Sequence, residues 1–110
     1  FVQTGIVTLA CFVSPTNDLR RMAKAIIGGG DFMEVYVSTP IQECERRDVK
    51  GLYARARRGE VKNFTGISAP FEVPEHADIS IDTSRLTLEE SVRTLTEEIV
   101  ERVKPTRETR

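Results

Sequence analysis

The stretch IVTLACFV, residues 6–13, is a nearly continuous apolar run. A short run that is rich in β-branched side chains is typical of a strand buried on both faces of a parallel sheet. FMEVYV at residues 32–37 is a second run of this kind, and a shorter one lies at residues 79–81. These runs predict the strands of one sheet.

Amphipathic patterns between and after these runs predict helices. Thr39 with Gln42 and Thr87 with Glu90 have the spacing of capping boxes, in which the threonine hydroxyl accepts a backbone N–H. Asp48 is a favourable N-cap for another helix. We expect helices at residues 18–27, 39–47, 49–58 and 88–103, and the end of a further helix at residues 1–5.

The order of these elements indicates the class of fold. Strands that alternate with helices form a parallel sheet with helices on both faces, the α/β class. In such folds ligands bind at the carboxyl ends of the strands, which here are Ser14–Pro15, Ser38–Thr39 and Asp82–Thr83. Residues 60–77 show no periodicity, and loops of this length in compact domains are usually lids or binding loops.

Composition restricts the partners and the cellular setting. The 110 residues suit one modest domain, and a net charge of −1 predicts neither nucleic-acid nor membrane binding. No apolar stretch approaches the ~20 residues of a membrane span. Cys11 and Cys44 are not spaced as a zinc or disulfide motif, and His76 is the only histidine, so we expect no metal site and a reducing, cytoplasmic setting. Because the chain begins at Phe1 without a start methionine, we expect it to be a piece of a longer protein.

A basic block interrupts this neutral composition. Residues 43–62 hold seven basic and four acidic side chains, a local net charge of +3. Such a block suggests an anionic ligand, although charge alone favours a solvated helix face. Lys50 lies near a predicted helix N-terminus, which favours anions. Phe64 stands in the irregular loop, where it either pins the loop to the core or offers a platform for a flat base.

Three segments together resemble one enzyme family. RDVKGLYARARRGEVKNFTGI, residues 47–67, is similar to the lid signature of adenylylsulfate (APS) kinases, FVSP at 12–15 is similar to their FISP, and FMEVYVSTPIQECERRD at 32–48 to their FIEVFVDTPLEVCExRD. The resemblance runs in register from Thr4 to Ser84. It implies a P-loop kinase-like fold, with residues 1–110 as its C-terminal portion and a lid over about residues 48–77.

The resemblance also implies an activity. APS kinases transfer the γ-phosphoryl group of ATP to the 3′-hydroxyl of adenosine 5′-phosphosulfate (APS), which gives 3′-phosphoadenosine 5′-phosphosulfate in sulfate assimilation. ATP is then the phosphoryl donor, Mg²⁺ the expected cofactor and a homodimer the usual assembly. The resemblance fits both a stand-alone kinase and one fused to, or associated with, a sulfurylase.

Carried over by position, the resemblance implies two groups of site residues. The ATP base would lie against Arg47, with Thr83 and Leu86 on its other side. In bacterial members the serine matching Ser14 has been described as a phosphorylated intermediate, but in-line transfer needs positioning and charge stabilisation, so we expect no covalent role for it. With Phe64 stacked on the adenine, the APS site would comprise Val13, Ser14, Arg20, Lys50, Asn63 and Phe64.

The phosphate-binding loop of this class is not found in residues 1–110. No G-x-x-x-x-G-K-[ST] occurs, so nothing in them would cradle the β- and γ-phosphates or hold Mg²⁺. We therefore expect the Walker A half and the Mg²⁺ ligands to lie outside these residues, and residues 1–110 alone to be inactive. Two alternatives stay open. One is a non-catalytic kinase-like module that binds adenine nucleotides or a partner subunit; the other, weakened by the intact lid signature, is another small-molecule kinase of the P-loop class.

Overall fold

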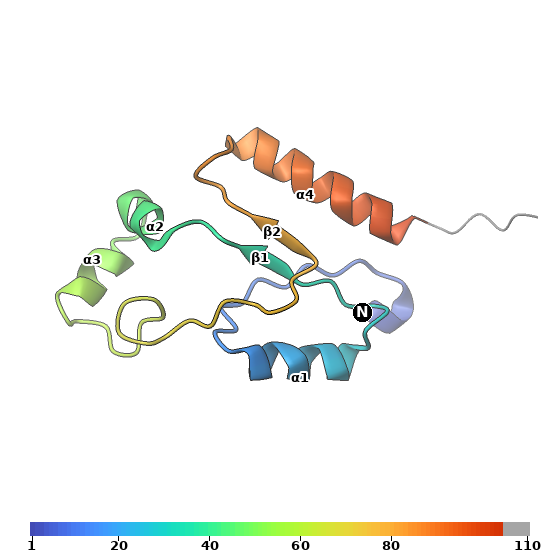
Figure 1. The fold of residues 1–110 in the computed structure, drawn as a ribbon, viewed down its shortest axis with the longest axis horizontal. Helices are drawn as coiled ribbons and strands as arrows, with labels where there is room; N and C mark the ends of the chain where they lie inside the picture. Colours follow the sequence, from blue (N-terminus) through green and yellow to red (C-terminus); the bar gives the residue numbers. More distant parts are fainter. Residues whose placement is uncertain (105–110) are drawn as a thin grey trace, which may run out of the picture.

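The computed structural model describes residues 1–104, and Figure 1 shows them as an open α/β arrangement. The elements follow in the order η1 (a 3₁₀ helix, Val2–Thr4), α1 (Asn17–Ile27), β1 (Val35–Val37), α2 (Ile41–Arg47), α3 (Leu52–Arg57), β2 (Ile79–Ile81) and α4 (Leu88–Val103). The predicted helices are confirmed, and so are the second and third predicted strands, although β1 is shorter than its apolar run.

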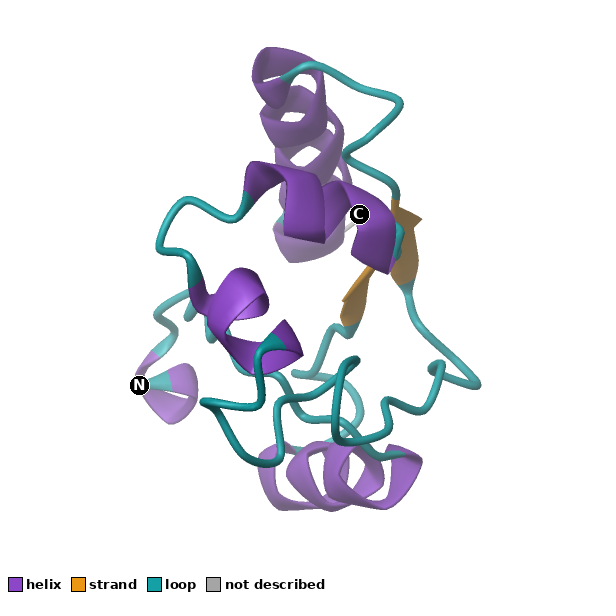
Figure 2. Cartoon of the chain, turned by 90° about the vertical axis from the view of Figure 1, so that its left-hand side faces the viewer, coloured by secondary structure: helices purple, strands orange, loops and turns teal. Residues whose placement is uncertain are grey.

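The sheet consists of two short parallel strands. Val35 of β1 lies opposite Ile79 of β2, and Val37 lies opposite Ile81. The Ser38 amide continues this ladder by donating to the Ile81 carbonyl at 2.8 Å. Figures 1 and 2 show α1 and α4 on opposite sides of the sheet. The prediction of a parallel sheet with helices on both faces is therefore confirmed.

The first predicted strand is wrong. Residues 6–13 form no strand, and their large side chains are exposed, with Phe12 at 83% and Leu9 at 76%. An apolar run signals only that a segment can be buried, because the burial and the ladder of hydrogen bonds come from neighbouring strands. Within residues 1–104 no strand pairs with this segment, since the sheet contains β1 and β2 alone.

Polar residues define where the later helices begin. The Thr87 hydroxyl accepts a hydrogen bond from the Glu90 amide at 3.1 Å, so α4 starts as predicted. The prediction that Asp48 is the N-cap of the next helix is wrong, because α3 begins later and its N-cap is Gly51. The Asp48 carboxylate still accepts from the amides of Tyr53 and Ala54 in the first turn of α3, at 2.9 and 3.0 Å. These hydrogen bonds satisfy backbone N–H groups that have no partner inside the helix.

Few side chains of the described chain are buried. The buried hydrophobic residues of residues 1–104 are Ala56 and Ile81, and the molecule extends over 63 × 31 × 24 Å. The apolar faces of α1 and α4 are open, with Ile26 77% and Leu88 81% exposed. None of the described helices is long and apolar enough to cross a membrane. Within the described residues, polar contacts join the segments that carry the candidate site residues.

Candidate functional site

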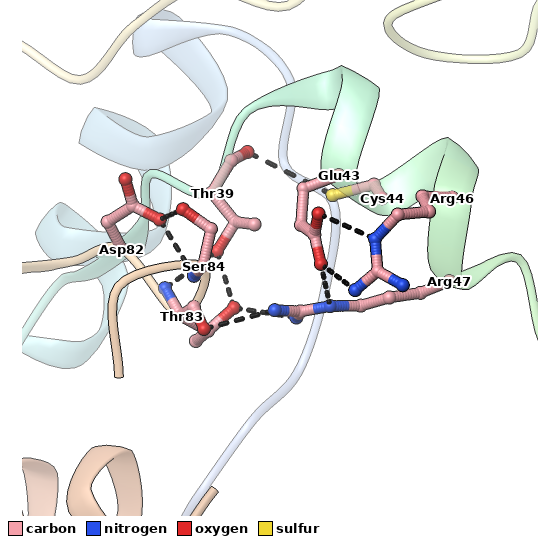
Figure 3. Close-up of polar contacts among 8 residues, drawn as sticks. All are labelled: Thr39, Glu43, Cys44, Arg46, Arg47, Asp82, Thr83 and Ser84. Atoms are coloured by element: carbon pink, nitrogen blue, oxygen red, sulfur yellow. Dashed lines mark hydrogen bonds and ion pairs between the residues drawn. The ribbon is translucent and has the colours of Figure 1, made fainter. Parts of the chain in front are cut away.

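Two threonines meet where β1 and β2 end. Thr39 follows β1, and Thr83 follows β2. Their hydroxyl oxygens lie 2.6 Å apart and form a hydrogen bond (Figure 3). The Thr83 amide also donates to the Thr39 hydroxyl at 3.0 Å. This contact corrects the predicted role of Thr39, because α2 begins after Pro40 without a side-chain cap. The threonines join the carboxyl ends of the strands, where ligands bind in α/β folds.

Arg47, the last residue of α2, reaches this pair of threonines. Its Nη1 donates to the Thr83 hydroxyl at 2.8 Å, and its Nη2 donates to the Thr83 carbonyl at 3.0 Å (Figure 3). Two residues predicted for the ATP site are thus in contact. Leu86, the third, is half-buried in the loop between β2 and α4. A planar guanidinium held at a strand end suits stacking on a flat base.

Glu43 belongs to the same cluster, although the sequence analysis did not single it out. Its carboxylate accepts from Arg47 Nε at 3.0 Å and from Arg46 Nε at 2.9 Å. Hydrogen bonds from Arg46, and then from Arg47, outweigh partial desolvation and lower the pKa of Glu43 from 4.5 to about 2. The sequence does contain a signal for this ion pair, because Glu43 and Arg47 have the i, i+4 spacing of neighbouring side chains on a helix face.

Asp82 shapes the loop that carries Thr83. Its Oδ1 accepts from the amide and the hydroxyl of Ser84 at 2.9 and 2.5 Å. These bonds lower the pKa of Asp82 below its usual range, and the bond from the Ser84 hydroxyl makes the largest contribution. Aspartate that bonds its own backbone two residues on is a common way to order a turn. Thr83 is therefore held between an ordered turn and the arginine of α2.

A second cluster surrounds the buried Arg20. Its Nη1 donates to the Ser14 carbonyl at 2.5 Å, and its Nη2 donates to the Asn17 side-chain oxygen at 3.0 Å. Its Nε lies 3.3 Å from the Glu34 carboxylate, an ion pair without hydrogen-bond geometry. Ser14 and Arg20, both predicted for the APS site, are thus in contact, whereas Val13 beside them is 63% exposed.

The same cluster fastens the end of the long loop. Arg20 Nη2 also donates to the Glu72 carbonyl at 2.5 Å, and the guanidinium carbon lies 5.4 Å from the centre of the Phe71 ring. The Glu72 amide donates to the Pro15 carbonyl at 2.8 Å, and the Asn17 amide donates to the Glu72 carboxylate at 2.8 Å. Neither Asn17 nor Glu72 was predicted, because these contacts join segments that are distant in the chain.

The expected lid, residues 48–77, carries the other predicted APS residues. Lys50 is exposed in the turn between α2 and α3, and Asn63 is exposed with a φ of 54°. Phe64 is half-buried and packs edge to face on Tyr53 of α3, with ring centres 5.0 Å apart at 71°. Within residues 1–104, no hydrogen bond or ion pair joins these three side chains to the Arg20 cluster.

Three carboxylates are shared among the five arginines of the basic block. Each arginine of residues 43–62 forms an ion pair: Arg46 and Arg47 with Glu43, Arg55 and Arg58 with Glu60, and Arg57 with Glu45. In the part of the chain that the structure describes, Lys50 and Lys62 form no ion pair. These lysines are therefore the cations of the block that no carboxylate of the described residues holds, and their charge is available to an anionic ligand.

Replacing Arg20 with alanine is expected to destabilise the full-length protein by about 3–5 kcal/mol, because the change leaves the largely buried Glu34 carboxylate unpaired. Arg21→Ala is a matched control on the same helix. Its ion pairs are exposed, so its loss should change the free energy of unfolding by no more than about 0.5 kcal/mol. Urea denaturation compares the two variants, and equal losses would show that Arg20 is not an anchor.

Comparison with known proteins identifies the class and then the family. The structure of the Mycobacterium tuberculosis APS kinase CysC in complex with AMPPNP and APS matches 80% of this chain and 51% of its own, with a TM-score of 0.70 and 38% identity. The fold is therefore that of a P-loop kinase. The family model for adenylylsulphate kinase matches residues 1–82. The chain belongs to the adenylylsulphate kinase family, as the resemblance predicted.

Curated relatives agree with this assignment. The adenylyl-sulfate kinase of Phocaeicola vulgatus is 71% identical over 97 residues, which cover 88% of this chain and 48% of the relative. That of Bacteroides fragilis is 65% identical over 103 residues, which cover 94% of this chain and 51% of the relative. The chain thus spans about half the length of the curated relatives it matches.

Proposed function

We propose that the full-length protein is an adenylylsulfate kinase, which transfers the γ-phosphoryl group of ATP to the 3′-hydroxyl of APS and makes 3′-phosphoadenosine 5′-phosphosulfate for sulfate assimilation. The match of residues 1–82 to the family carries this proposal. The contact between Arg47 and Thr83 at the strand ends supports it, because it joins two residues that the family resemblance assigns to one nucleotide.

Backbone conformation supports the proposed APS site. Among residues 1–104, the non-glycine residues with φ in the left-handed region are Ser14 at 41° and Asn63 at 54°, and both are among the proposed APS residues. Backbone strain of this kind clusters at ligand sites. Arg20 would act on APS indirectly, by holding Ser14, since the Arg20 guanidinium donates a hydrogen bond to the Ser14 carbonyl. The proposed APS residues are Val13, Ser14, Arg20, Lys50, Asn63 and Phe64.

The ATP site would use the cluster at the end of the sheet. Arg47 would pack on the base, and Thr83 and Leu86 would close its other side. The Thr83 loop is ordered by Asp82, so the surface offered to the base is already shaped. What these residues do in the reaction is to bind and orient the two nucleotides, a contribution that accounts for a large share of catalysis in phosphoryl transfer.

Mg²⁺ is the metal that ATP-dependent kinases use to neutralise charge on the phosphates. Mg²⁺ is held in such sites by one or two protein oxygens together with the phosphates, and we propose that the residues that hold it lie outside residues 1–110. A homodimer and a link to a sulfurylase stay predictions. A cytoplasmic setting likewise stays a prediction.

A coupled assay of ATP-dependent APS phosphorylation by the purified full-length protein tests the proposed activity. Turnover to 3′-phosphoadenosine 5′-phosphosulfate would support it. Nucleotide binding without any turnover would favour the non-catalytic kinase-like module. Phosphorylation of a different small molecule, with APS left unchanged, would favour another kinase of the P-loop class.

Lys50→Ala is expected to raise the KM for APS about tenfold, because a charge-assisted contact to the anion is lost. The free energy of unfolding should change by no more than about 0.5 kcal/mol, since Lys50 is exposed. Arg58→Ala is the matched control, because that charge is already paired with Glu60 and its removal should leave the KM near wild type. A Lys50 variant that melts early with unchanged APS kinetics would mean that Lys50 is structural.

A further inference from the structure

We propose that Glu43 is a positioning residue that holds the Arg47 guanidinium with a face open to the adenine base of ATP. The inference rests on the proposed function, because it takes Arg47 as the arginine that packs on that base. Glu43 acts through Arg47 and does not need to touch the nucleotide.

The hydrogen bonds of Arg47 occupy the edge of its guanidinium and leave its faces free. Nε donates to Glu43 at 3.0 Å, while Nη1 and Nη2 donate to Thr83 at 2.8 and 3.0 Å. Since the N–H groups of a guanidinium lie in its plane, these bonds hold the plane from two sides. Figure 3 shows the group spanning the space between Glu43 and Thr83. The Arg47 side chain is still 42% exposed, so a ligand can reach it.

Glu43 determines the orientation of this plane because Thr83 holds only the far end. Without the Nε bond, the side chain could swing about its contacts with Thr83. Glu43 is itself fixed, since Arg46 donates to both of its carboxylate oxygens and its side chain is 21% exposed. The carboxylate is therefore a firm reference point on α2 against which Arg47 is aligned.

The same contacts limit what Arg47 can recognise. Three of its five N–H donors are bonded to Glu43 and Thr83, and Glu43 offsets part of its charge, so it is better suited to stack on a flat base than to grip a phosphate in a bidentate manner. Hydrogen bonds from Arg46 and then Arg47 hold the pKa of Glu43 at about 2, so the carboxylate remains ionised at neutral pH. Its effect on nucleotide binding should not change across neutral and mildly alkaline pH.

Calorimetric binding of AMPPNP to the full-length protein, together with steady-state kinetics, tests this role. Glu43→Ala is expected to raise the Kd of AMPPNP and the KM for ATP about fivefold, with the KM for APS near wild type. Glu43→Gln keeps an oxygen that can accept from Arg47 and should restore most of the affinity. Glu60→Ala is the matched control, because Glu60 also pairs with two arginines of the basic block.

A double-mutant cycle measures the dependence on Arg47. Arg47→Ala is expected to weaken AMPPNP binding about tenfold, and Glu43→Ala should add nothing to that loss. Additive losses, an unchanged Kd in Glu43→Ala, or an equal rise in the KM for APS would overturn the inference. A wild-type protein that shows these dependences but does not phosphorylate APS would refute the proposed function and leave the role of Glu43 standing. A wild-type protein that does not bind AMPPNP would refute both.

Discussion

Phe64→Ala is expected to raise the KM for APS about ten- to a hundredfold in the full-length protein, because stacking of a base on an aromatic ring is worth roughly 1–3 kcal/mol. The ring is half-buried, and its contact with Tyr53 is edge to face. Such a contact involves one side of the Phe64 ring, so a surface remains for the adenine of APS. The KM for ATP should change little, since Arg47 and Thr83 are the proposed contacts of that nucleotide.

Three further variants separate base stacking from a structural role. Phe64→Tyr and Phe64→Trp retain an aromatic face and should keep most of the APS affinity. Phe71→Ala is the matched control from the same long loop, because Phe71 lies against Arg20 and Tyr36 and should affect stability more than the use of APS. Equal loss for both nucleotides, or a loss that tyrosine does not rescue, would mean that Phe64 only holds the loop in place.

Residues 1–110 expressed alone are expected to show no ATP-dependent phosphorylation of APS, so that the measured rate equals the background of the assay. Phosphoryl transfer depends on positioning and on neutralising charge, and these residues contain no phosphate-binding loop motif. The structure adds a second reason, since Ala56 and Ile81 are the buried hydrophobic residues of the described chain. Polypeptides with so little apolar burial rarely hold a site in one geometry.

The measurement is the same coupled assay, run on residues 1–110 and on the full-length protein side by side. The full-length protein serves as the positive control for substrates and coupling enzymes. Turnover by residues 1–110 above the rate without protein would contradict the prediction. It would also show that these residues supply their own means of holding the phosphates.

Elements with local signals were predicted well. Thr87 caps α4 because its hydroxyl bonds the Glu90 amide only three residues away, which a sequence pattern can reveal. The strand at residues 79–81 was also located correctly. The strand at residues 6–13 was not, because its formation depends on neighbouring strands and not on its own residues.

The contacts among the predicted site residues could not be read from the sequence. The resemblance named Arg47 and Thr83, yet it did not show that they touch. Glu43 was not predicted, although its i, i+4 spacing to Arg47 places the two side chains on the same face of a helix. The bond between Asn17 and Glu72 had no local signal, since 55 residues separate the two in the chain.

By itself, the sequence determined the family, the order of the helices with the strands β1 and β2, and the cap of α4. Contiguous motifs and hydrogen bonds between near neighbours carry that information. Only the tertiary structure decided that, within residues 1–104, residues 6–13 lie outside the sheet, Thr39 bonds Thr83 instead of capping α2, and the arginines of the basic block are paired while Lys50 is not. Burial and ion pairing depend on which distant segments come together, and no local pattern encodes that meeting.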